Sequence, residues 1–429
     1  MTELDIDMLL VGAGPANLAL AVALEELVPD TPQRTLIVEQ HDGVVWQRGM
    51  LLPWSQSQVS FLKDLVTLRN PRSAFSFVNY LHSVGRLDEF INLGSATPYR
   101  LEISGYLSWV ADSLATTKVE YGRKVASVEP RRDAAGGIDH WSVTMADGTT
   151  LTCRDLVIGA GRDPHVPEVF DRLPAERVIH STGFAHAVGA LDPETTRRVA
   201  VIGAAQSAAE MLWTTHQSFP AAECTMIMRS IGLNSYESSK FTNEIFYASF
   251  VDTFHESPPE ARAQLLREMH RTNYAGLAPA MLETLYRQTY LERLTGTERL
   301  HMVTMTDVVS ARTDGGEIVL GLCDRRTGRT SEFRCDVVML GTGFESGMPR
   351  MIREMCASFG LDDIRVDRNY ALRLPEGSDA SCYLQGVNEA THGIADSLLS
   401  VLAARSADIV SDLMTRRSVS PLVSDVAAA

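Results

Sequence analysis

The stretch Met8-Leu9-Leu10-Val11-Gly12-Ala13-Gly14-Pro15-Ala16-Asn17 decides the fold of this chain. Its apolar first part predicts a buried strand, the glycines predict a tight turn, and the apolar residues that follow predict a helix. In such a unit the turn backbone can approach a pyrophosphate, while the helix N-terminus offers free N–H groups and a partial positive charge. Gly12, Gly14, Pro15 and Asn17 are therefore candidate dinucleotide-binding residues, although Asn17 stands where the common fingerprint has a third glycine.

A second strand is predicted over Thr35 to Val38, and it ends at Glu39. This acid follows the turn by about 25 residues, which is the place where a ribose diol needs a hydrogen-bond acceptor. Glu39, together with its neighbour Gln40, is therefore a candidate for binding the same dinucleotide.

A second strand–turn–helix unit begins at Val199 and continues through Gly203-Ala204-Ala205-Gln206-Ser207-Ala208. Ala205 replaces the middle glycine, so a Cβ lies where the backbone should approach the pyrophosphate. The next predicted strand is followed by Arg229 and not by an acid, and a cation there favours the extra phosphate of NADPH. The alternative is that Arg229 is a solvated surface residue. The candidates for this second cofactor are Ala204, Ala205, Gln206, Ser207 and Arg229.

Two dinucleotide units in one chain predict an α/β fold with two Rossmann-like domains, one for a flavin and one for a nicotinamide. Strands that end in glycine turns, over 155–161 and 336–344, bracket the second unit. We therefore predict an NADPH-binding domain over 170–343, inserted in a discontinuous FAD-binding domain over 1–169 and 344–429.

Three further segments complete the predicted organisation. Residues 45–104 are aromatic and rich in turns, which indicates an insertion over a cofactor and not sheet. Residues 235–295 predict a small helical substrate-binding region, with helices over 258–271 and 278–294 that cap the cleft between the cofactors. A final helix is predicted over 394–414.

Composition excludes several classes of function. The chain has 429 residues, enough for two or three domains, and its net charge of -15 argues against a nucleic-acid or anionic-membrane surface. Its six cysteines form no C-x-x-C pair, so a disulfide framework, a metal site and a dithiol reductase centre lack support. No signal peptide and no membrane-spanning stretch is visible, and we expect a cytoplasmic protein with reduced thiols.

Several blocks of the sequence resemble a known family, the microbial amine N-hydroxylating flavoprotein monooxygenases. These are the L-ornithine N5- and L-lysine N6-monooxygenases of siderophore biosynthesis. The blocks that carry the resemblance are Gly12 to Leu18, Trp46 to Leu51, Gln58 to Leu65, Arg69 to Leu81, Asn243 to Phe246, Thr272 to Tyr274 and Gln385 to Ser400.

The resemblance implies an enzyme that uses FAD and NADPH to hydroxylate the terminal amine of a free amino acid. Hydride passes from NADPH to the flavin, dioxygen adds at C4a to give a hydroperoxide, and the neutral amine attacks the distal oxygen. The hard chemistry belongs to the cofactor, so no protein nucleophile is required. Related enzymes are often tetramers, and a homotetramer is the corresponding expectation here.

The resemblance also implies roles for individual residues. Lys63 would pair with the substrate carboxylate, Asn243 would hold the amino-acid head group, and Asn273 would touch both nicotinamide and reacting amine. A surface salt bridge for Lys63, and turn or cap roles for the two asparagines, are the alternatives. The other implied flavin contacts are Trp46, Gln47 (where a His is usual), Gln58, Val125, His392, Gly393 and Ile394, and the other implied substrate contacts are Glu244, Phe246 and Ala395.

His392-Gly393-Ile394 should present a helix N-terminus to the flavin ring, where the dipole would stabilise negative charge. The alternative is a histidine that simply starts a helix.

The choice of substrate rests on two conflicting signals. Ornithine-type relatives often carry a serine at the position of Ala395, and Gly393-Ile394-Ala395 looks more like the lysine type. Asn243 to Phe246 and Asn273-Tyr274 look like the ornithine type. We therefore favour L-ornithine, with L-lysine or another amine as the alternative. A diamine would leave Lys63 without a carboxylate to bind.

Two other functions are weighed against this one. A Baeyer–Villiger enzyme would carry an F-x-G-x-x-x-H run between the two nucleotide units, and residues 179–184 do not match it. A redox-inactive nucleotide-binding scaffold remains possible, and NADPH would not reduce its flavin.

Overall fold

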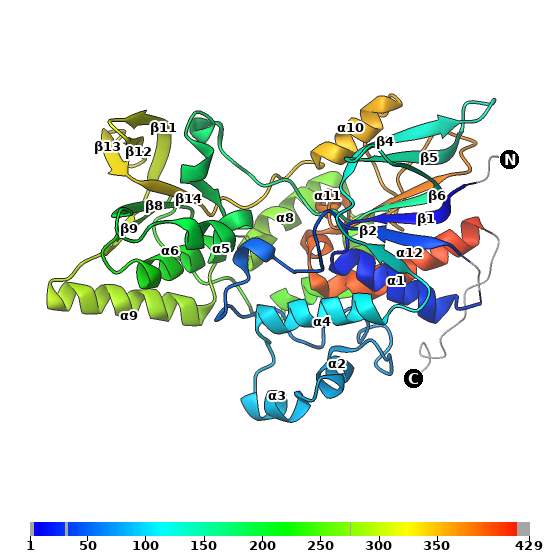
Figure 1. Ribbon diagram of the computed structural model, residues 1–429, viewed down its shortest axis with the longest axis horizontal. Coiled ribbons are helices and arrows are strands. Elements are labelled where there is room, and N and C mark those ends of the chain that lie inside the picture. Colours follow the sequence, from blue (N-terminus) through cyan, green and yellow to red (C-terminus); the bar gives the residue numbers. More distant parts are fainter. Residues whose placement is uncertain (1–3, 31–32, 275, 418–429) are drawn as a thin grey trace.

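A seven-stranded sheet forms the larger half of the molecule (Figure 1). The computed structural model describes residues 4–30, 33–274 and 276–417. The strand order is β3-β2-β1-β6-β5-β4, and β15 pairs with β6. The strands are β1 (Ile6–Val11), β2 (Thr35–Val38), β3 (Lys118–Glu120), β4 (Val125–Arg132), β5 (Ile138–Met145), β6 (Thr150–Ile158) and β15 (Ser381–Leu384). Because β15 lies far along the chain yet pairs in parallel with β6, the sheet is assembled from both ends of the sequence.

A second sheet lies beside the first along the long axis of the molecule (Figure 1). Its five strands are all parallel, in the order β10-β9-β8-β14-β7. They are β7 (Val178–His180), β8 (Arg198–Ile202), β9 (Glu223–Ile227), β10 (Leu300–Val303) and β14 (Val337–Leu340). The helix α6 (Gln206–Ser218) packs on one face, and an antiparallel sheet of β11 (Thr306–Asp314), β12 (Glu317–Asp324) and β13 (Thr330–Cys335) shares a core with the other. The predicted α/β fold with two Rossmann-like domains is confirmed.

The segment 45–104 contains no named strand in the structure, as predicted. It contains the 3-10 turn Arg48–Met50 and the helices α2 (Phe77–Ser83), α3 (Leu87–Leu93) and the start of α4 (Arg100–Ser113). Aromatic rings hold it together, with Phe77 in contact with Phe61, Phe90 and Tyr106 at ring-centroid distances of 5.5–6.0 Å. The insertion is therefore a small aromatic unit packed on the first sheet's helices.

The segment 235–295 is helical, as predicted. It consists of a 3-10 turn (Thr242–Phe246), α7 (Ala248–Glu256), α8 (Pro259–Asn273) and α9 (Pro279–Thr295). α7 and α8 pack against the C-terminal segment near Gly393. α9 packs instead on α6 and β10 and runs along the outside of the second sheet (Figure 1). The expectation that both predicted helices cap the cleft is therefore wrong for α9.

The prediction of one helix over 394–414 is wrong at its start. α11 (Glu389–His392) is followed by the 3-10 turns Ile394–Ser397 and Leu399–Val401, and α12 spans only Leu402–Arg416. Leu398 is extended, with φ -111° and ψ 162°, so it interrupts the helix. Asp396 accepts a hydrogen bond from the Asn388 N–H at 2.7 Å and pairs with Arg405 of α12 at 2.9 Å. These contacts hold the segment against α12.

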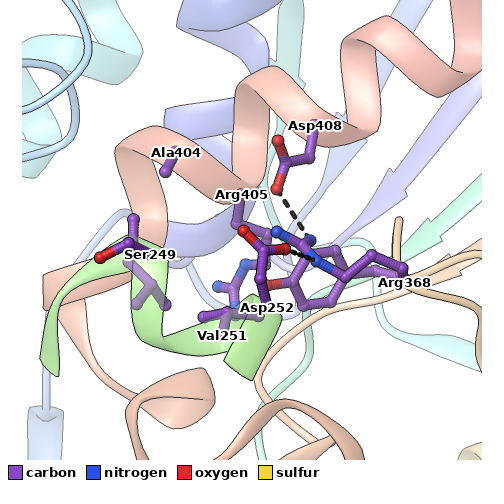
Figure 2. Close-up of a pocket in the computed structure, with 10 residues that line it drawn as sticks. Ser249, Val251, Asp252, Arg368, Ala404, Arg405 and Asp408 are labelled. Carbon is purple, nitrogen blue, oxygen red and sulfur yellow. Dashed lines mark hydrogen bonds and ion pairs between the residues drawn. The ribbon is translucent and has the colours of Figure 1, made fainter. Parts of the chain in front are cut away.

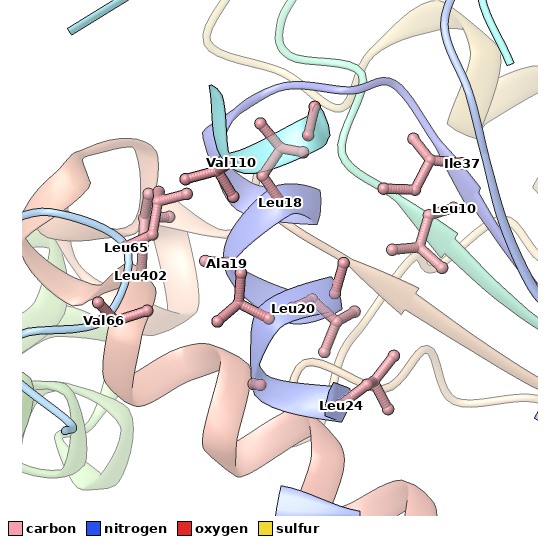
Figure 3. Close-up of a cluster of buried hydrophobic side chains, with 14 of the residues drawn as sticks. Leu10, Leu18, Ala19, Leu20, Leu24, Ile37, Leu65, Val66, Val110 and Leu402 are labelled. Atoms are coloured by element: carbon pink, nitrogen blue, oxygen red, sulfur yellow. The ribbon is translucent and has the colours of Figure 1, made fainter. Parts of the chain in front are cut away.

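The core of the first half is built around α1 (Pro15–Leu27). Leu18 through Ala23 are fully buried, and they pack between Leu10 and Ile37 of the sheet and Leu402 of α12 (Figure 3). Burial of each large apolar side chain contributes about 1.5–3 kcal/mol, so this helix anchors the nucleotide turn that precedes it.

Within the described ranges, no helix is long and apolar enough to cross a membrane.

The Asp396–Arg405 pair supplies a test of the C-terminal packing. Both side chains are about 1 % exposed or less, and Arg405 also donates to Gln385 Oε1 at 3.1 Å. Arg405→Met should lower the free energy of unfolding by about 3–5 kcal/mol, because Asp396 would stay buried without its cation. Arg416→Met is the control: its side chain is 45 % exposed, and it should cost under about 1 kcal/mol. Equal losses in urea-induced unfolding would contradict this view of the pair.

Candidate active site between two nucleotide turns

The first glycine turn is wedged against the end of β6. Gly12 has φ +92°, and a Cβ on it would lie 3.0 Å from the Gly159 carbonyl oxygen. α1 begins at Pro15, and no side chain caps its N-terminus at Gly14. The first N–H groups of α1 are therefore available to a ligand, which fits a pyrophosphate.

Asn17 braces this turn from inside the protein. Its Nδ2 donates to the carbonyl oxygens of Val11 at 2.9 Å and Gly12 at 2.8 Å, and its Oδ1 accepts from Gln385 Nε2 at 2.9 Å. A third glycine would offer none of these bonds. With Asn17 in place of the third glycine of the common fingerprint, the turn therefore gains a hydrogen-bonded link to the C-terminal segment.

Glu39 lies beside the same turn. Its Oε2 accepts a hydrogen bond from the Ala13 N–H at 2.8 Å, and Oε1 accepts from the His41 N–H at 3.0 Å. The carboxylate is half-buried, so it has lone pairs left for a ribose. Gln40 is exposed next to it.

Four other predicted flavin contacts are spread along residues 46–125 of the first half: Trp46, Gln47, Gln58 and Val125. Trp46 is half-buried, and its backbone N–H donates to Ser104 Oγ at 3.1 Å. Gln47 is exposed in a left-handed conformation with φ 49°, and Gln58 is exposed. Val125 begins β4, and its side chain is buried in the sheet core, which leaves only its backbone to meet a ligand.

The second turn repeats the geometry of the first. Gly203 has φ +134°, and a Cβ on it would lie 2.5 Å from the Gly341 carbonyl oxygen at the end of β14. α6 begins at Gln206, and no side chain caps it at Ala205. Ala204, Ala205 and Ser207 are half-buried around the open N-terminus.

Two candidates of the second unit are placed differently. The Gln206 side chain is used internally, since Nε2 donates to Glu210 Oε1 at 2.8 Å and Oε1 accepts from the Ala278 N–H at 2.9 Å. Arg229 is exposed directly after β9, and it forms no ion pair with the residues that the structure describes. Its guanidinium is therefore available to a phosphate.

Lys63 is a half-buried cation. Its Nζ donates to Ser400 Oγ at 3.1 Å and lies 5.5 Å from the centre of the Phe246 ring. No carboxylate of the described residues pairs with it. Burial lowers the pKa of Lys63, because the charged form loses solvation. A site with this arrangement favours an anionic ligand.

The predicted substrate residues Phe246 and Ala395 meet near this ammonium. Ala395 is 2 % exposed and packs with Val251 and Val401, and Phe246 packs against the same cluster. The structure thus brings Lys63, Phe246 and Ala395 together from three distant parts of the chain.

Asn243 and Asn273 lie on two elements that pack against the turn Ile394–Ser397. Asn243 is in the 3-10 turn that also carries the exposed Glu244, and Asn273 is the last residue of α8. Neither side-chain amide forms a hydrogen bond with the described part of the chain. Both amides are available to a ligand at this turn.

His392 and Gly393 do not open a long helix toward a flavin, as the fold has already shown. His392 is 1 % exposed and stacks on Tyr370, with ring centroids 4.1 Å apart. Its Nε2 lies 3.1 Å from the Arg368 carbonyl oxygen, which can only accept, so the proton is assigned to Nε2. Burial lowers the pKa of His392 to about 4, so the ring is neutral near pH 7. Ile394 begins only a 3-10 turn, and the expected dipole of a long helix is absent there.

Sequence reasoning missed Arg162 and Glu389, which join these parts together with Tyr274. Glu389 Oε2 accepts from Arg162 Nη2 at 2.9 Å and from the Tyr274 hydroxyl at 2.7 Å. Burial raises the pKa of Tyr274, so its hydroxyl keeps the proton that it donates. This cluster ties the end of α8, and with it Asn273, to the C-terminal segment. Arg162 and Glu389 are 227 residues apart, so no local pattern could pair them.

A cavity of about 190 Å³ lies beyond Val251 and Val401, between α7 and α12 (Figure 2). Arg368 points into it and pairs with Asp252 at 2.6 Å and with Asp408 at 3.0 Å. Its charge is therefore balanced by protein carboxylates, unlike that of Lys63. This contrast identifies Lys63, and not the cavity, as the place for an anion.

Comparison with known proteins gives relatives over nearly the whole chain. The L-ornithine N(5)-monooxygenase of Burkholderia cepacia is 39% identical over 402 residues, which is 91% of this chain and 90% of that protein. The structure of ornithine hydroxylase (PvdA) from Pseudomonas aeruginosa superimposes with a TM-score of 0.89 at 35% identity, covering 96% of this chain and 99% of that one. The Kutzneria sp. 744 ornithine N-hydroxylase KtzI, solved with reduced FAD, NADP+ and L-ornithine, gives a TM-score of 0.88 at 33% identity, with 96% and 99% covered.

The family model for L-lysine 6-monooxygenase/L-ornithine 5-monooxygenase matches residues 5–346. That span includes both nucleotide turns, Lys63 and both asparagines. The chain belongs to the L-lysine 6-monooxygenase/L-ornithine 5-monooxygenase family.

Proposed function

We propose that this protein is an FAD- and NADPH-dependent monooxygenase that converts L-ornithine to N5-hydroxyornithine for siderophore or related hydroxamate biosynthesis. The observation that carries the proposal is the Lys63 ammonium, half-buried beside Ser400 and Phe246 without a carboxylate partner among the described residues. An amino acid supplies that carboxylate, and a charge-assisted contact fixes its orientation. L-lysine or another amine is the alternative substrate.

The two uncapped helix N-termini support the pair of cofactors. We assign FAD to the turn of Gly12 and Gly14 with Glu39, and NADPH to the turn that starts at Gly203, with Ser207 and Arg229 near the extra phosphate. The corresponding domains are 1–169 with 344–429 for FAD, and 170–343 for NADPH. When bound, FAD would supply the activated oxygen, and the substrate amine, dioxygen, NADPH and a proton would yield the hydroxylamine, water and NADP+.

The protein's own residues then bind, orient and shield the substrate. Lys63 holds the carboxylate, and the Asn243 and Asn273 amides receive the two amino groups near the turn Ile394–Ser397. Phe246 and the buried Ala395 keep water from the amine-bearing chain. The His392 ring is neutral near pH 7, so it adds no positive charge beside the turn Ile394–Ser397. Positioning of this kind can supply a large part of a rate enhancement.

A cytoplasmic location is consistent with the cysteines. All six are free, and five of them are buried. Thiols persist in a reducing compartment, which is also where we place the enzyme.

The product assay is the direct test of substrate choice. We expect hydroxylamine formation with L-ornithine, with less from L-lysine and least from putrescine, because putrescine has no carboxylate for Lys63. Hydroxylamine must be measured and not NADPH consumption, since an uncoupled flavin makes peroxide without oxidising an amine. A flavin that NADPH leaves oxidised would favour the scaffold alternative and end the proposal.

Lys63→Ala should raise the KM for L-ornithine by about tenfold to a hundredfold, the loss expected for a hydrogen bond to a charged group. FAD retention should be unchanged. Lys118→Ala is the control, because that lysine side chain is 72% exposed on β3. Equal loss of flavin and of substrate saturation would show that Lys63 has a structural role.

Lys63 also predicts a pH dependence. Because burial lowers its pKa, the ammonium deprotonates at a lower pH than an ordinary lysine, and carboxylate binding weakens as the pH rises through that value. A guanidinium stays protonated throughout. The ratio of kcat/KM for Lys63→Arg to that of the wild type should therefore rise at alkaline pH, and a flat ratio would contradict the assignment.

We also propose that the chain forms a homo-oligomer, with a tetramer as the expected state. α9 supports this, since Tyr286, Tyr290 and Leu294 repeat at helical spacing and are 62–72% exposed. Tyr290→Asp should lower the molar mass measured by sedimentation. Ile91→Asp, at an exposed apolar residue of α3, should leave the mass unchanged. A monomeric wild type would contradict the proposal.

A further inference from the structure

A buried ion pair joins the two halves of the molecule. Arg100, at the start of α4, donates from Nη1 to Glu210 Oε2 at 2.8 Å and from Nη2 to Glu210 Oε1 at 2.7 Å. Glu210 lies in α6 beside the second sheet, whereas α4 packs on α1 of the first. The two side chains are only 8% and 1% exposed. The contact is bidentate, so it fixes both a distance and an angle between the two helices.

One end of this pair is tied to the turn Arg48–Met50, and the other end is tied to the second glycine turn. Arg100 Nη1 also donates to the Met50 carbonyl oxygen at 3.0 Å, at the end of the turn that begins with Trp46 and Gln47. Glu210 Oε1 also accepts from Gln206 Nε2, and Gln206 is the first residue of α6 after the glycine turn. One continuous chain of hydrogen bonds therefore runs from the turn Arg48–Met50, next to the predicted flavin contacts Trp46 and Gln47, to the start of α6 after the second glycine turn.

The same chain extends to the substrate region. Gln206 Oε1 accepts from the Ala278 N–H at 2.9 Å, just before α9 begins. Leu277 is fully buried in the core of the second sheet and pairs with Asn234 and Tyr236 through its backbone. The ion pair thus lies where three functional segments meet.

Apolar packing around the pair also joins the two halves. Met50 and Leu52, which belong to the first half by sequence, are buried in the apolar core of the second sheet with Ile179 and Phe184. At Gly49 the backbone runs so close to Thr182 that any Cβ would overlap the Thr182 carbonyl group. The turn Arg48–Met50 therefore packs into the core of the second half, and Arg100 binds its last carbonyl oxygen.

We propose that Arg100 and Glu210 are positioning residues for hydride transfer. They hold the second glycine turn, where we place NADPH, in register with the turn Arg48–Met50, which follows the predicted flavin contacts Trp46 and Gln47. A buried ion pair adds little net stability, because desolvation offsets the attraction, so its main effect here is on orientation. Hydride transfer is sensitive to misplacement of about 1 Å, which can cost on the order of 100-fold in rate. The inference rests on the proposed use of FAD and NADPH.

Two variants separate orientation from folding. Glu210→Gln keeps the shape and an acceptor for Gln206 but removes the charge. The double variant Arg100→Met with Glu210→Met replaces the pair by apolar side chains, a change that commonly preserves stability. His216→Gln is the matched control. It lies in the same helix six residues later, pairs with Glu292 at 2.6 Å, and does not reach the first half.

The measurement is the anaerobic rate of flavin reduction by NADPH and, separately, by dithionite. Both variants should slow reduction by NADPH about tenfold or more and leave reduction by dithionite unchanged, because dithionite needs no domain register. In nucleotide-free protein, hydrogen exchange should rise in residues 47–52 and at the start of α6. His216→Gln should change neither result.

Three outcomes would overturn the inference: an unchanged NADPH rate, a loss equal to that of His216→Gln, or exchange that rises uniformly through both sheets. A wild-type flavin that NADPH does not reduce would instead contradict the proposed function. Hydrogen exchange in the nucleotide-free protein would still test whether the Arg100–Glu210 pair holds the two halves together.

Discussion

The close contact between each nucleotide turn and the next parallel strand is the constraint on which the rest of the structure depends. Gly12 faces the glycine that ends β6, and Gly203 faces the glycine that ends β14. A Cβ on Gly159 would meet Asn17 at 2.8 Å, and a Cβ on Gly341 would meet Ala208 at 2.5 Å. Side chains at these glycines would push the helix away from the sheet and close the space over its N-terminus. Both proposed cofactor sites therefore require a glycine at the end of two strands, not of one.

The sequence predicted those elements whose signal is local. Strand–turn–helix units, the inserted aromatic segment and the spans of α8 and α9 all follow from periodicity and turn residues. Where long-range contacts decide, prediction failed. Leu398 and the buried Asp396–Arg405 pair break the expected final helix, and the packing of α9 on α6 removes it from the cleft. Ser400, although it lies in a recognised block, was not singled out because only the fold brings it to Lys63.

Electrostatics separates the proposed substrate site around Lys63 from the other charged places in this protein. Arg368, Arg405 and Arg100 are all at least partly buried, and each is matched by protein carboxylates. Burying a charge is costly unless a partner compensates it, so matched pairs are the ordinary case. Lys63 lacks such a partner in the described part of the chain, and its hydroxyl and ring contacts compensate it only in part. A bound carboxylate would remove this cost, so in the proposed function the unpaired lysine selects amino acids over simple amines.

The two buried arginine pairs, Arg405–Asp396 and Arg100–Glu210, connect different segments of the protein. Arg405 links Asp396 and Gln385, and through Gln385 it reaches Asn17, so hydrogen bonds connect the first glycine turn with the Ile394–Ser397 segment. Arg100 does the same for Met50 and Glu210, which belong to different halves. Two different turns of the first half are thereby connected: the Gly12 turn to the Ile394–Ser397 segment, and the turn Arg48–Met50 to the start of α6. Three reactants must meet within a few ångströms, and directional bonds fix such a meeting better than apolar packing, which tolerates sliding.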